Sequence, residues 1–416
     1  MADGKKMAES QSTAVKKLKA TAAAGAHQKE WFTGLKARVE AGEDFGYLNA
    51  DVPMEVLRAM DIPFVVNQWW AAICGAKRMT KKYYGLLREA GYRDDLCSYC
   101  ATAFAESLDP DDHKLDAEGR PLGPWGGLPD PTIAITRLTC DCQSKIFELF
   151  AQNHGASFYA MENTVARKTP LKWFELAPDR WEELYDTDRL DTAVEELKEL
   201  IRFLEMKTGK MFDINKLEHV MNLINEQEMW YKKTRDLIAA CHPVPVTVVD
   251  TINAVMQAQW QRGTQWAADH AKSLYEEVKA LADKGAAAVP NEKYRLMWIG
   301  RGIWHDFSFY QRFEQKYGAS SGNASGGMSA SFTVVTLNQG QILYMGVGCE
   351  VMLRTGSGVC VAASTPGLID ETSGAALAGG RGLQKNHLYM ATVDSRGVQA
   401  SANSTKLLVR GNYSVQ

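Results

Sequence analysis

Two closely spaced cysteine pairs are the residues best suited to chemistry. Cys97 and Cys100 enclose two residues in the segment CSYC, and Cys140 and Cys142 enclose one in CDC. Each pair directly precedes a segment with a helical pattern, where unpaired N–H groups and the helix dipole stabilise thiolates. Thiolates bind soft metals, so the two pairs, about 40 residues apart, favour either zinc or an iron-sulfur cluster.

The remaining cysteines carry a weaker signal. Eight cysteines in a chain without a secretory signal pattern favour reduced thiols or metal ligands over a disulfide framework. Cys74 and Cys241 stand alone in apolar surroundings, so we expect them to pack as small hydrophobic side chains.

The elements that must position the two pairs alternate short β-branched runs with long helical patterns. This order is typical of βαβ units around a mainly parallel sheet. Strands are predicted over residues 63–67, 132–138, 157–161 and 294–300. CDC lies at the carboxyl end of the second strand, the edge where α/β sheets bind ligands. Glu162 and Asn163 follow the third strand, so we expect them to line the same cleft and contact a substrate.

Long helices complete this part of the chain. In TAVEELKELIRFLEMKTGK the apolar residues recur at helical spacing, and Gly209 is a natural stop. Two further long helices are predicted over residues 215–240 and 248–283, separated by Pro243 and Pro245. The predicted fold class is therefore α/β, a parallel-sheet βαβ domain with long helices and a second, partial α/β region.

The composition changes near residue 318. Residues 318–330 contain no charged residue and have the Gly/Ser content of a flexible linker. All eleven tryptophans precede this segment, whereas residues 331–416 hold none and only ten charged residues. Short alternating runs punctuated by glycine predict a small all-β domain there, with its last strands within residues 385–394 and 405–415.

Four segments follow from these patterns. We predict a helical N-terminal extension at 1–44, an α/β region at 45–317, a linker at 318–330 and a small β domain at 331–416.

Composition and motifs exclude several classes of protein. A net charge of −3 lacks the basic excess of a nucleic-acid binder. No stretch approaches the ~18 apolar residues of a membrane span, and the N-terminus lacks the apolar core of a signal peptide, so we expect a cytoplasmic protein. GxGxxG, GxxxxGK[ST], GxSxG and HExxH are absent, so nucleotide phosphate loops, nucleophile elbows and zincin sites have no support.

Several motifs in order resemble the subunits of 2-hydroxyacyl-CoA dehydratases and of the related ATP-dependent benzoyl-CoA reductases. The resemblance is carried by PMEVLRAMDIPFVV, WAAICGAK, RDDLCSY, ITRLTCDCQSKIFELFA and MWIGRGIWHDFSFYQRFEQKYGA, between about residues 45 and 318. It implies an α/β protein that pairs with a second, related subunit. It also implies a 4Fe-4S cluster held by three cysteines, with one iron left open.

The resemblance assigns the cysteines individually. Cys97 matches the cysteine of the family's LCSY motif, and Cys140 matches the cysteine that follows the central strand. Cys100 and Cys142 are additional to the usual pattern and are secondary candidates for metal ligands. The family's third ligand lies beyond the segment FEQKYGA, where this chain turns into the predicted linker, so no residue takes over that role. Cys349 and Cys360 of the tail match nothing in the family.

The implied reaction is reductive. A separate ATP-dependent iron-sulfur activator protein would deliver one electron, which reaches the thioester carbonyl of a 2-hydroxyacyl-CoA. The resulting ketyl radical anion expels the neighbouring hydroxyl group as water. The open iron would bind substrate oxygen as a Lewis acid.

Two functions stay open at this point. The first is the iron-sulfur subunit of an acyl-CoA dehydratase or reductase complex, which predicts bound iron and a partner subunit. The alternative is a non-catalytic chimera of a truncated dehydratase-like domain with a β interaction module, which predicts a colourless chain that tolerates Cys97→Ser and Cys140→Ser.

Overall fold

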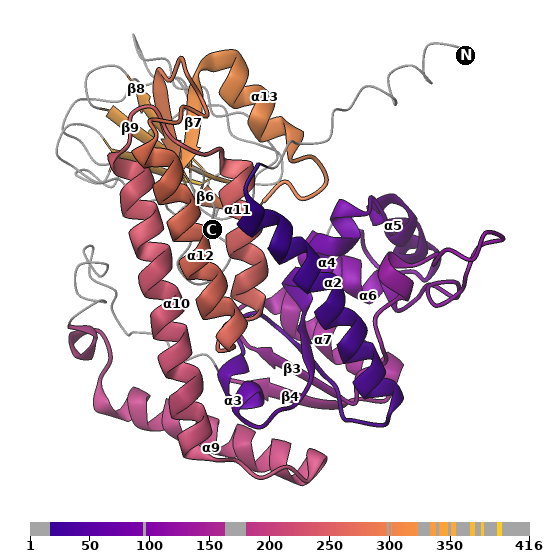
Figure 1. Ribbon diagram of the computed structural model, residues 1–416. Helices are drawn as coiled ribbons and strands as arrows, with labels where there is room; N and C mark the ends of the chain where they lie inside the picture. Colours follow the sequence, from indigo (N-terminus) through magenta and orange to yellow (C-terminus); the bar gives the residue numbers. More distant parts are fainter. Residues whose placement is uncertain are drawn as a thin grey trace. The chain divides into compact units, whose positions relative to one another are not determined.

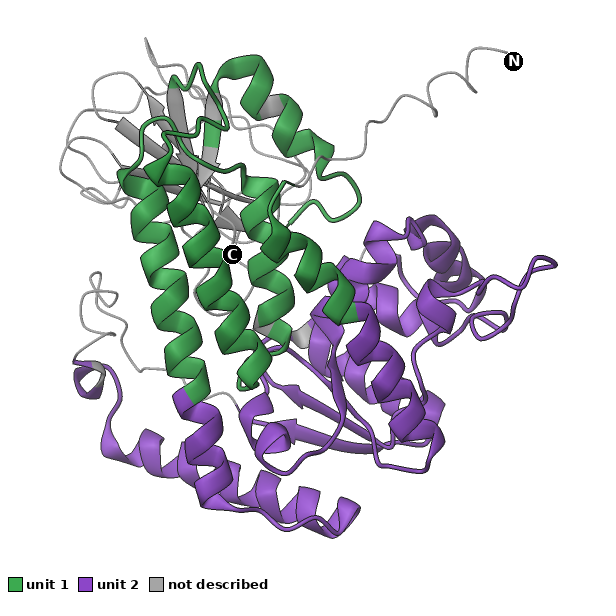
Figure 2. Ribbon diagram, in the orientation of Figure 1, with its two compact units in different colours: residues 1–28, 223–416 green, residues 29–222 purple. Residues whose placement is uncertain are grey.

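The chain is organised into two compact units. The computed structural model describes residues 17–94, 97–162, 180–297, 299–300 and 302–322, and six strands between residues 333 and 392 (Figure 1). One unit comprises residues 29–222, and the other comprises residues 1–28 and 223–416 (Figure 2). The predicted segment boundaries differ from this division and stay predictions.

The unit of residues 29–222 is built on a parallel sheet. Its strands are β1 (Gly46–Leu48), β2 (Phe64–Val66), β3 (Ile133–Arg137) and β4 (Ser157–Met161), in the order β2-β1-β3-β4. Every pair is parallel: Gly46 lies opposite Phe64 and Ile133, and Ile133 lies opposite Ser157. The predicted α/β class and three of the predicted strands are confirmed. β1 was not predicted, because its three residues lack the β-branched run that marks the other strands.

Helices surround this sheet. They are α3 (Met54–Ala59), α4 (Asn67–Ala76), α5 (Thr80–Glu89), α6 (Ser98–Glu106), α7 (Asp141–His154) and α9 (Thr187–Thr208), with 3-10 turns at Pro124–Gly126 and Trp181–Glu183. Helix α7 packs on β3 and β4, and α6 packs against α4, α5 and α7. Phe147 and Phe150 of α7 stack on Tyr47 of β1, with ring centroids 5.3 and 4.3 Å apart. Gly209 ends α9 with a left-handed φ of 67°, as predicted.

The other unit is mainly helical. It contains the start of α2 (Lys19–Glu40), most of α10 (Ile214–Ala240), and α11 (Val248–Trp260), α12 (Gln265–Asp283) and α13 (Ser308–Tyr317). The single helix predicted over residues 248–283 is wrong. Gly263 adopts φ 80°, which breaks the helix, and the Thr264 side chain accepts a hydrogen bond from the Ala267 N–H to begin α12.

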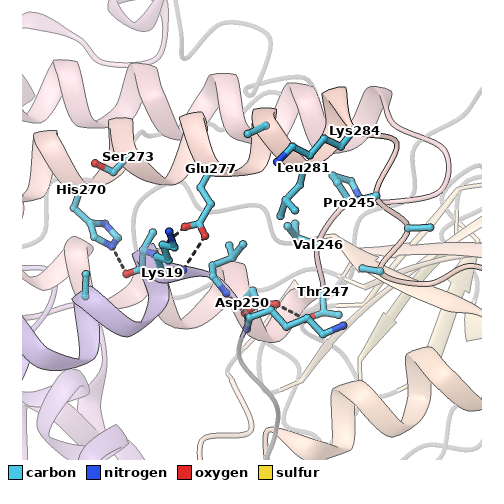
Figure 3. A pocket seen from close by; sticks show the side chains of 18 of the residues that line it. Lys19, Pro245, Val246, Thr247, Asp250, His270, Ser273, Glu277, Leu281 and Lys284 are labelled. Carbon is cyan, nitrogen blue, oxygen red and sulfur yellow. Dashed lines mark hydrogen bonds between the residues drawn. The ribbon is translucent and has the colours of Figure 1, made fainter.

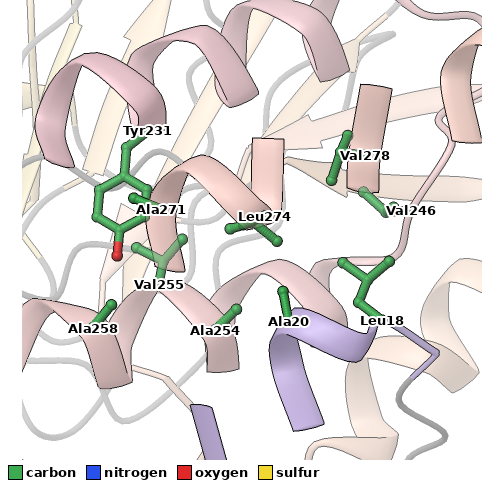
Figure 4. Close-up of a cluster of buried hydrophobic side chains, with 10 residues drawn as sticks. All are labelled: Leu18, Ala20, Tyr231, Val246, Ala254, Val255, Ala258, Ala271, Leu274 and Val278. Atoms are coloured by element: carbon green, nitrogen blue, oxygen red, sulfur yellow. The ribbon is translucent and has the colours of Figure 1, made fainter. Parts of the chain in front are cut away.

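A buried cluster joins the helices of this unit. Figure 4 shows its members, which are Leu18, Ala20, Tyr231, Val246, Ala254, Val255, Ala258, Ala271, Leu274 and Val278. Four of them are alanines, whose small side chains let the helix backbones approach closely. Because Leu18 and Ala20 belong to the cluster, the start of α2 is anchored to α11 and α12 by apolar packing as well as by polar contacts.

Two carboxylates clamp the first turn of α2. The Asp250 Oδ1 atom accepts hydrogen bonds from the backbone N–H groups of Lys17 and Leu18, at 2.6 and 3.2 Å. The Glu277 oxygens accept from the next two N–H groups, of Lys19 and Ala20, at 2.8 and 2.9 Å (Figure 3). The N–H groups of Leu18, Lys19 and Ala20 are among those that a helix cannot satisfy internally, and negative charge is favoured beside them.

Strands follow α12. β5 (Tyr294–Met297) pairs in parallel with β7 (Ala319–Gly322), so the first residues of the predicted linker form a strand. β6 (Ile299–Gly300), β8 (Thr333–Leu337), β9 (Gln341–Val347), β10 (Val351–Arg354), β11 (Gly367–Asp370), β12 (Ala376–Leu377) and β13 (Tyr389–Thr392) form a second sheet. Its order is β12-β11-β13-β10-β9-β6, and β8 pairs with β9. The strand predicted within residues 405–415 lies outside the described residues, and a separate small β domain stays a prediction.

A buried acidic pair lies at the end of helix α6 and in the segment that follows it. Glu106, the last residue of α6, and Asp112 are each 3% exposed. The Trp70 indole and the Leu128 N–H donate to Glu106, at 3.1 and 2.9 Å. Burial and the neighbouring Asp112 raise the pKa of Glu106 well above its usual value.

We expect Glu277→Gln to destabilise the protein by about 1–2 kcal/mol, because an amide can accept from only one of the two α2 N–H groups. Urea unfolding measures the loss. Glu276→Gln, at the adjacent exposed position, is the control and should leave stability unchanged. Equal midpoints for the two variants would contradict the clamp.

We expect Glu106→Gln to flatten the dependence of stability on pH. Since the folded-state pKa of Glu106 lies above its unfolded value, its contribution is complete below about pH 4.5 and is lost as pH rises, by on the order of 1 kcal/mol per unit. The glutamine amide does not titrate. Urea unfolding between about pH 5 and 8 gives the slope, with the exposed Glu118→Gln as control. The same slope in both variants would contradict a raised pKa of Glu106 in the folded protein.

Candidate functional site

The four predicted cysteines lie at the starts of two helices. Cys97 is the N-cap residue of α6, and Cys140 is the N-cap residue of α7. Neither forms a side-chain capping hydrogen bond, so the helix dipoles act on the thiols directly. CDC follows β3 and opens α7, as expected. CSYC opens α6 but follows helix α5, so only CDC lies at the turn after a strand.

Three of the four thiols are in contact. The Cys100 thiol, 1% exposed, is hydrogen-bonded to the thiols of Cys142 and Cys97, both of which are half-buried. These contacts, together with burial, raise the pKa of Cys100 well above its usual value. Cys140 is exposed. The structure thus joins one thiol of CDC to both thiols of CSYC.

Tyr84 of α5 lies against the same thiols. Burial raises the pKa of its hydroxyl to about 12, and the charges of Cys97, Cys100 and Cys142 contribute in the same direction. Tyr84 is half-buried, and its helix α5 packs against α6.

A buried asparagine fixes the first turn of α6. Asn67, the first residue of α4, follows β2 directly and is 1% exposed. Its Nδ2 atom donates to the Tyr99 carbonyl at 2.8 Å, between Cys97 and Cys100, and its Oδ1 atom accepts from the Tyr47 hydroxyl at 2.6 Å. The carboxyl end of β2 is thereby tied to the backbone that carries the two thiols.

A second amide network fixes the first turn of α7. Asn49 follows β1 and forms two hydrogen bonds of 2.9 Å with Gln143, the residue next to Cys142. Gln68 of α4 donates to Asn49 at 2.9 Å. Asn49 and Gln143 are 0% and 8% exposed. Because buried amides are costly to leave unpaired, both networks hold the helix starts in one arrangement.

The donor type at the starts of α6 and α7 is the thiol, which iron-sulfur clusters take as ligand. Within the described ranges, no three His, Cys, Asp or Glu side chains converge in a way that would hold one metal ion. A cluster presents several irons, each of which takes its own thiolate, so its ligands need not share one centre. Several thiols at two helix N-termini, beside a buried amide network, are suited to that chemistry.

Glu162, which was predicted to contact a substrate, lies at the carboxyl end of β4, the strand next to β3. Glu162 follows β4 and is exposed; its carbonyl accepts from the Arg137 side chain at 3.3 Å, and its N–H donates to Glu196 at 3.2 Å. Nothing in these contacts ties Glu162 to the thiols. Asn163 lies outside the described residues.

The described residues also line two cavities away from these cysteines. One, of about 840 Å³, lies beside the α2 clamp and is lined by Lys19, Asp250, Trp266, His270, Glu277 and Lys284 among others (Figure 3). The other, of about 280 Å³, is lined by Trp31, Arg38, Arg58 and Phe64 among others. None of the candidate residues predicted from the sequence lines either cavity.

The fold and the site define an α/β protein whose thiols gather beside a parallel sheet. Comparison of the sequence with known protein families identifies the family. The model of the family "2-hydroxyglutaryl-CoA dehydratase, D-component" matches residues 49–339. The chain belongs to this family, as the resemblance predicted. The matched range extends past the predicted boundary at residue 317. In the part of the chain that the structure describes, no helix is long and apolar enough to cross a membrane.

Two curated relatives are similar over most of this chain. The (R)-2-hydroxyisocaproyl-CoA dehydratase alpha subunit of Clostridioides difficile is 22% identical over 293 residues, which cover 70% of this chain and 66% of the relative. The (R)-phenyllactyl-CoA dehydratase alpha subunit of Clostridium sporogenes is 26% identical over 276 residues, which cover 64% and 59%. The chain thus spans less than two thirds of the length of these relatives.

The residues that hold the starts of α6 and α7 in place were not predicted from the sequence. Asn49, Asn67 and Gln143 are polar residues beside strands or in the first turns of helices, and no motif marks them. Recognising the short strand β1 would have placed Asn49 at its carboxyl end. Tyr84 comes near the thiols because α5 packs against α6, and the spacing of apolar residues along the sequence does not predict that packing.

We expect Asn67→Leu to destabilise the protein by about 2–4 kcal/mol, because the Tyr47 hydroxyl and the Tyr99 carbonyl lose their buried partner. The looser first turn of α6 should also raise the rate at which iodoacetamide modifies Cys100, measured by mass spectrometry. Adding Tyr47→Phe removes one unpaired group and should restore part of the stability. A destabilised Asn67→Leu variant with unchanged Cys100 reactivity would show that this asparagine does not position the thiols.

Proposed function

We propose that the chain is an enzyme subunit of the 2-hydroxyacyl-CoA dehydratase type that holds a 4Fe-4S cluster. The observation that carries the proposal is the gathering of thiols from two separate cysteine pairs beside the carboxyl edge of the sheet. Family membership supports it. Cys97 and Cys140 are the ligands predicted from the sequence, and Cys100 and Cys142 are the secondary candidates.

The residues around the thiols have roles that follow from their contacts. Asn67 and Gln143 would hold the two helix starts in register, and Tyr84 would shield the thiols on the α5 side. The uncapped N-termini of α6 and α7 would favour thiolates over thiols. When bound, the cluster would supply one-electron transfer and a Lewis-acidic iron. Glu162 and Asn163 are proposed to line the substrate site.

The proposal includes partners. We infer a second dehydratase-family subunit and an ATP-dependent iron-sulfur activator protein, with an acyl-CoA thioester as substrate. The names of the two relatives, both alpha subunits of 2-hydroxyacyl-CoA dehydratases, support dehydration. The same one-electron transfer from a cluster would also allow the related reaction, ring reduction of the benzoyl-CoA reductase type.

The chain purified without oxygen, alone and with its partner subunit, should contain about four irons and four acid-labile sulfides and give an electron paramagnetic resonance signal on reduction. With the activator, ATP and a reductant, the complex should eliminate water from a 2-hydroxyacyl-CoA. Cys74→Ala, which removes a buried thiol of α4 outside the site, is the control and should retain the iron.

Absence of iron and sulfide, even after anaerobic reconstitution with the partner subunit, would contradict the proposal. The non-catalytic reading would then account for the chain. A cluster without turnover of any 2-hydroxyacyl-CoA would direct the search to aromatic acyl-CoA reduction.

A further inference from the structure

The larger of the two described cavities has an apolar end. This cavity, of about 840 Å³, lies within the unit of residues 1–28 and 223–416, beside the start of α2, the start of α11 and helix α12 (Figure 3). The apolar end is lined by Leu18, Pro245, Val246, Leu281 and residues 286–288. Because small-molecule sites are mostly apolar concave surfaces with a few polar groups, this lining is suited to a hydrocarbon chain.

Backbone hydrogen bonds fix the walls of the apolar end. The Ala288 N–H donates to the Val244 carbonyl at 2.8 Å, and the Ala286 N–H donates to the Leu281 carbonyl at 3.0 Å. The segment after α12 is therefore tied both to α12 and to the segment that precedes α11. Val246 belongs to the buried cluster of this unit, and Leu281 packs against that cluster (Figure 4). The apolar end is thus formed before any ligand binds.

Two lysines at this end are available to a ligand. Lys17 and Lys284 line the cavity and are exposed, and neither ammonium group has a carboxylate partner among the described residues. The carboxylate at this end, Asp250, is already engaged: Oδ1 accepts from the N–H groups of Lys17 and Leu18, and Oδ2 accepts from the Thr247 hydroxyl at 3.1 Å. The two positive charges therefore favour an anionic group beside the apolar end.

The other charged residues that line the cavity are Lys19, Asp269 and Glu277. Glu277 accepts hydrogen bonds from the first turn of α2, and Asp269 accepts one from Gln265 at 3.0 Å. Since carboxylates occupy the N–H groups at the start of α2, this helix start lacks the free donors that bind phosphate. A carboxylate ligand needs no such donors, because ammonium groups pair with it directly.

We propose that the cavity is a binding site for a free carboxylic acid with a medium-length hydrocarbon chain. The chain lies against the apolar end, and the carboxylate is held between the ammonium groups of Lys17 and Lys284 by charge-assisted hydrogen bonds. The site goes beyond the proposed function, because none of the candidate cysteines lines the cavity.

Calorimetric titration of the full-length chain with matched eight-carbon probes tests the class of ligand. Octanoate should bind, 1-octanol should bind about tenfold more weakly because it lacks the charge, and octylammonium should not bind because the lysines repel it. Hexanoate should bind about tenfold more weakly than octanoate, because each buried CH₂ group changes the affinity about fourfold. These comparisons need no substitution in the protein.

Variants test the position of the ligand. The double variant Lys17→Gln, Lys284→Gln should bind octanoate about tenfold more weakly and 1-octanol unchanged. Lys279→Gln is the matched control, because Lys279 is also an exposed lysine of α12 but does not line the cavity. Ala286→Phe fills the apolar end and should abolish binding of both probes. Circular dichroism reports whether each variant folds.

A footprint on the wild-type chain also locates the site without a substitution. Octanoate should slow the acetylation of Lys17 and Lys284 by acetic anhydride, measured by mass spectrometry, and leave Lys279 unaffected. Equal protection of all three lysines, or none, would contradict the position of the carboxylate.

Each further outcome decides one statement. Equal affinity for octanoate and octylammonium overturns the anionic ligand, and unchanged octanoate binding in a folded Ala286→Phe variant overturns the apolar end as its site. A chain that binds no octanoate, or that loses binding when the partner subunit is added, overturns the proposal. The proposed iron-sulfur function is unaffected by these outcomes, because iron and sulfide are measured independently.

Discussion

The positions of the thiols beside the sheet depend on the hydrogen bonds of a few buried amide side chains. Asn67 joins β2 to the backbone between Cys97 and Cys100, and Asn49 joins β1 to Gln143 beside Cys142. Unpaired amides at these positions would each cost about 1–3 kcal/mol, so the starts of α6 and α7 have little freedom to move apart. The strands thus set the spacing of the thiols, although no thiol lies on a strand.

Opposing electrostatic effects meet at these thiols. Burial and mutual contact favour the neutral form and raise the pKa of Cys100, while two uncapped helix N-termini favour thiolates. A bound metal shifts this balance, because metal ligation requires the deprotonated thiol. The neutral thiols are stable in the folded chain, so the proposed cluster would be acquired after folding.

In the unit of residues 1–28 and 223–416, the start of α2 likewise depends on contacts with residues far away in the sequence. The first N–H groups of α2 are satisfied by Asp250 and Glu277, more than 200 positions away in the chain, and Leu18 packs into the core formed by α10, α11 and α12. The beginning of the chain and its later helices therefore fold as one unit. This is why the compact units do not follow the segments that composition suggests along the sequence.

The sequence by itself determined the family, the α/β class, three of the four parallel strands and the positions of the cysteine pairs at helix starts. These properties depend on local periodicity and on motif spacing, which neighbouring residues encode. Only the tertiary structure decided that Cys142 contacts Cys100, that helix 248–283 breaks at Gly263, and that Asn49 and Asn67 hold the helix starts. Those outcomes depend on backbone conformation and on contacts between residues far apart in the chain, where packing and the pairing of buried polar groups select one arrangement.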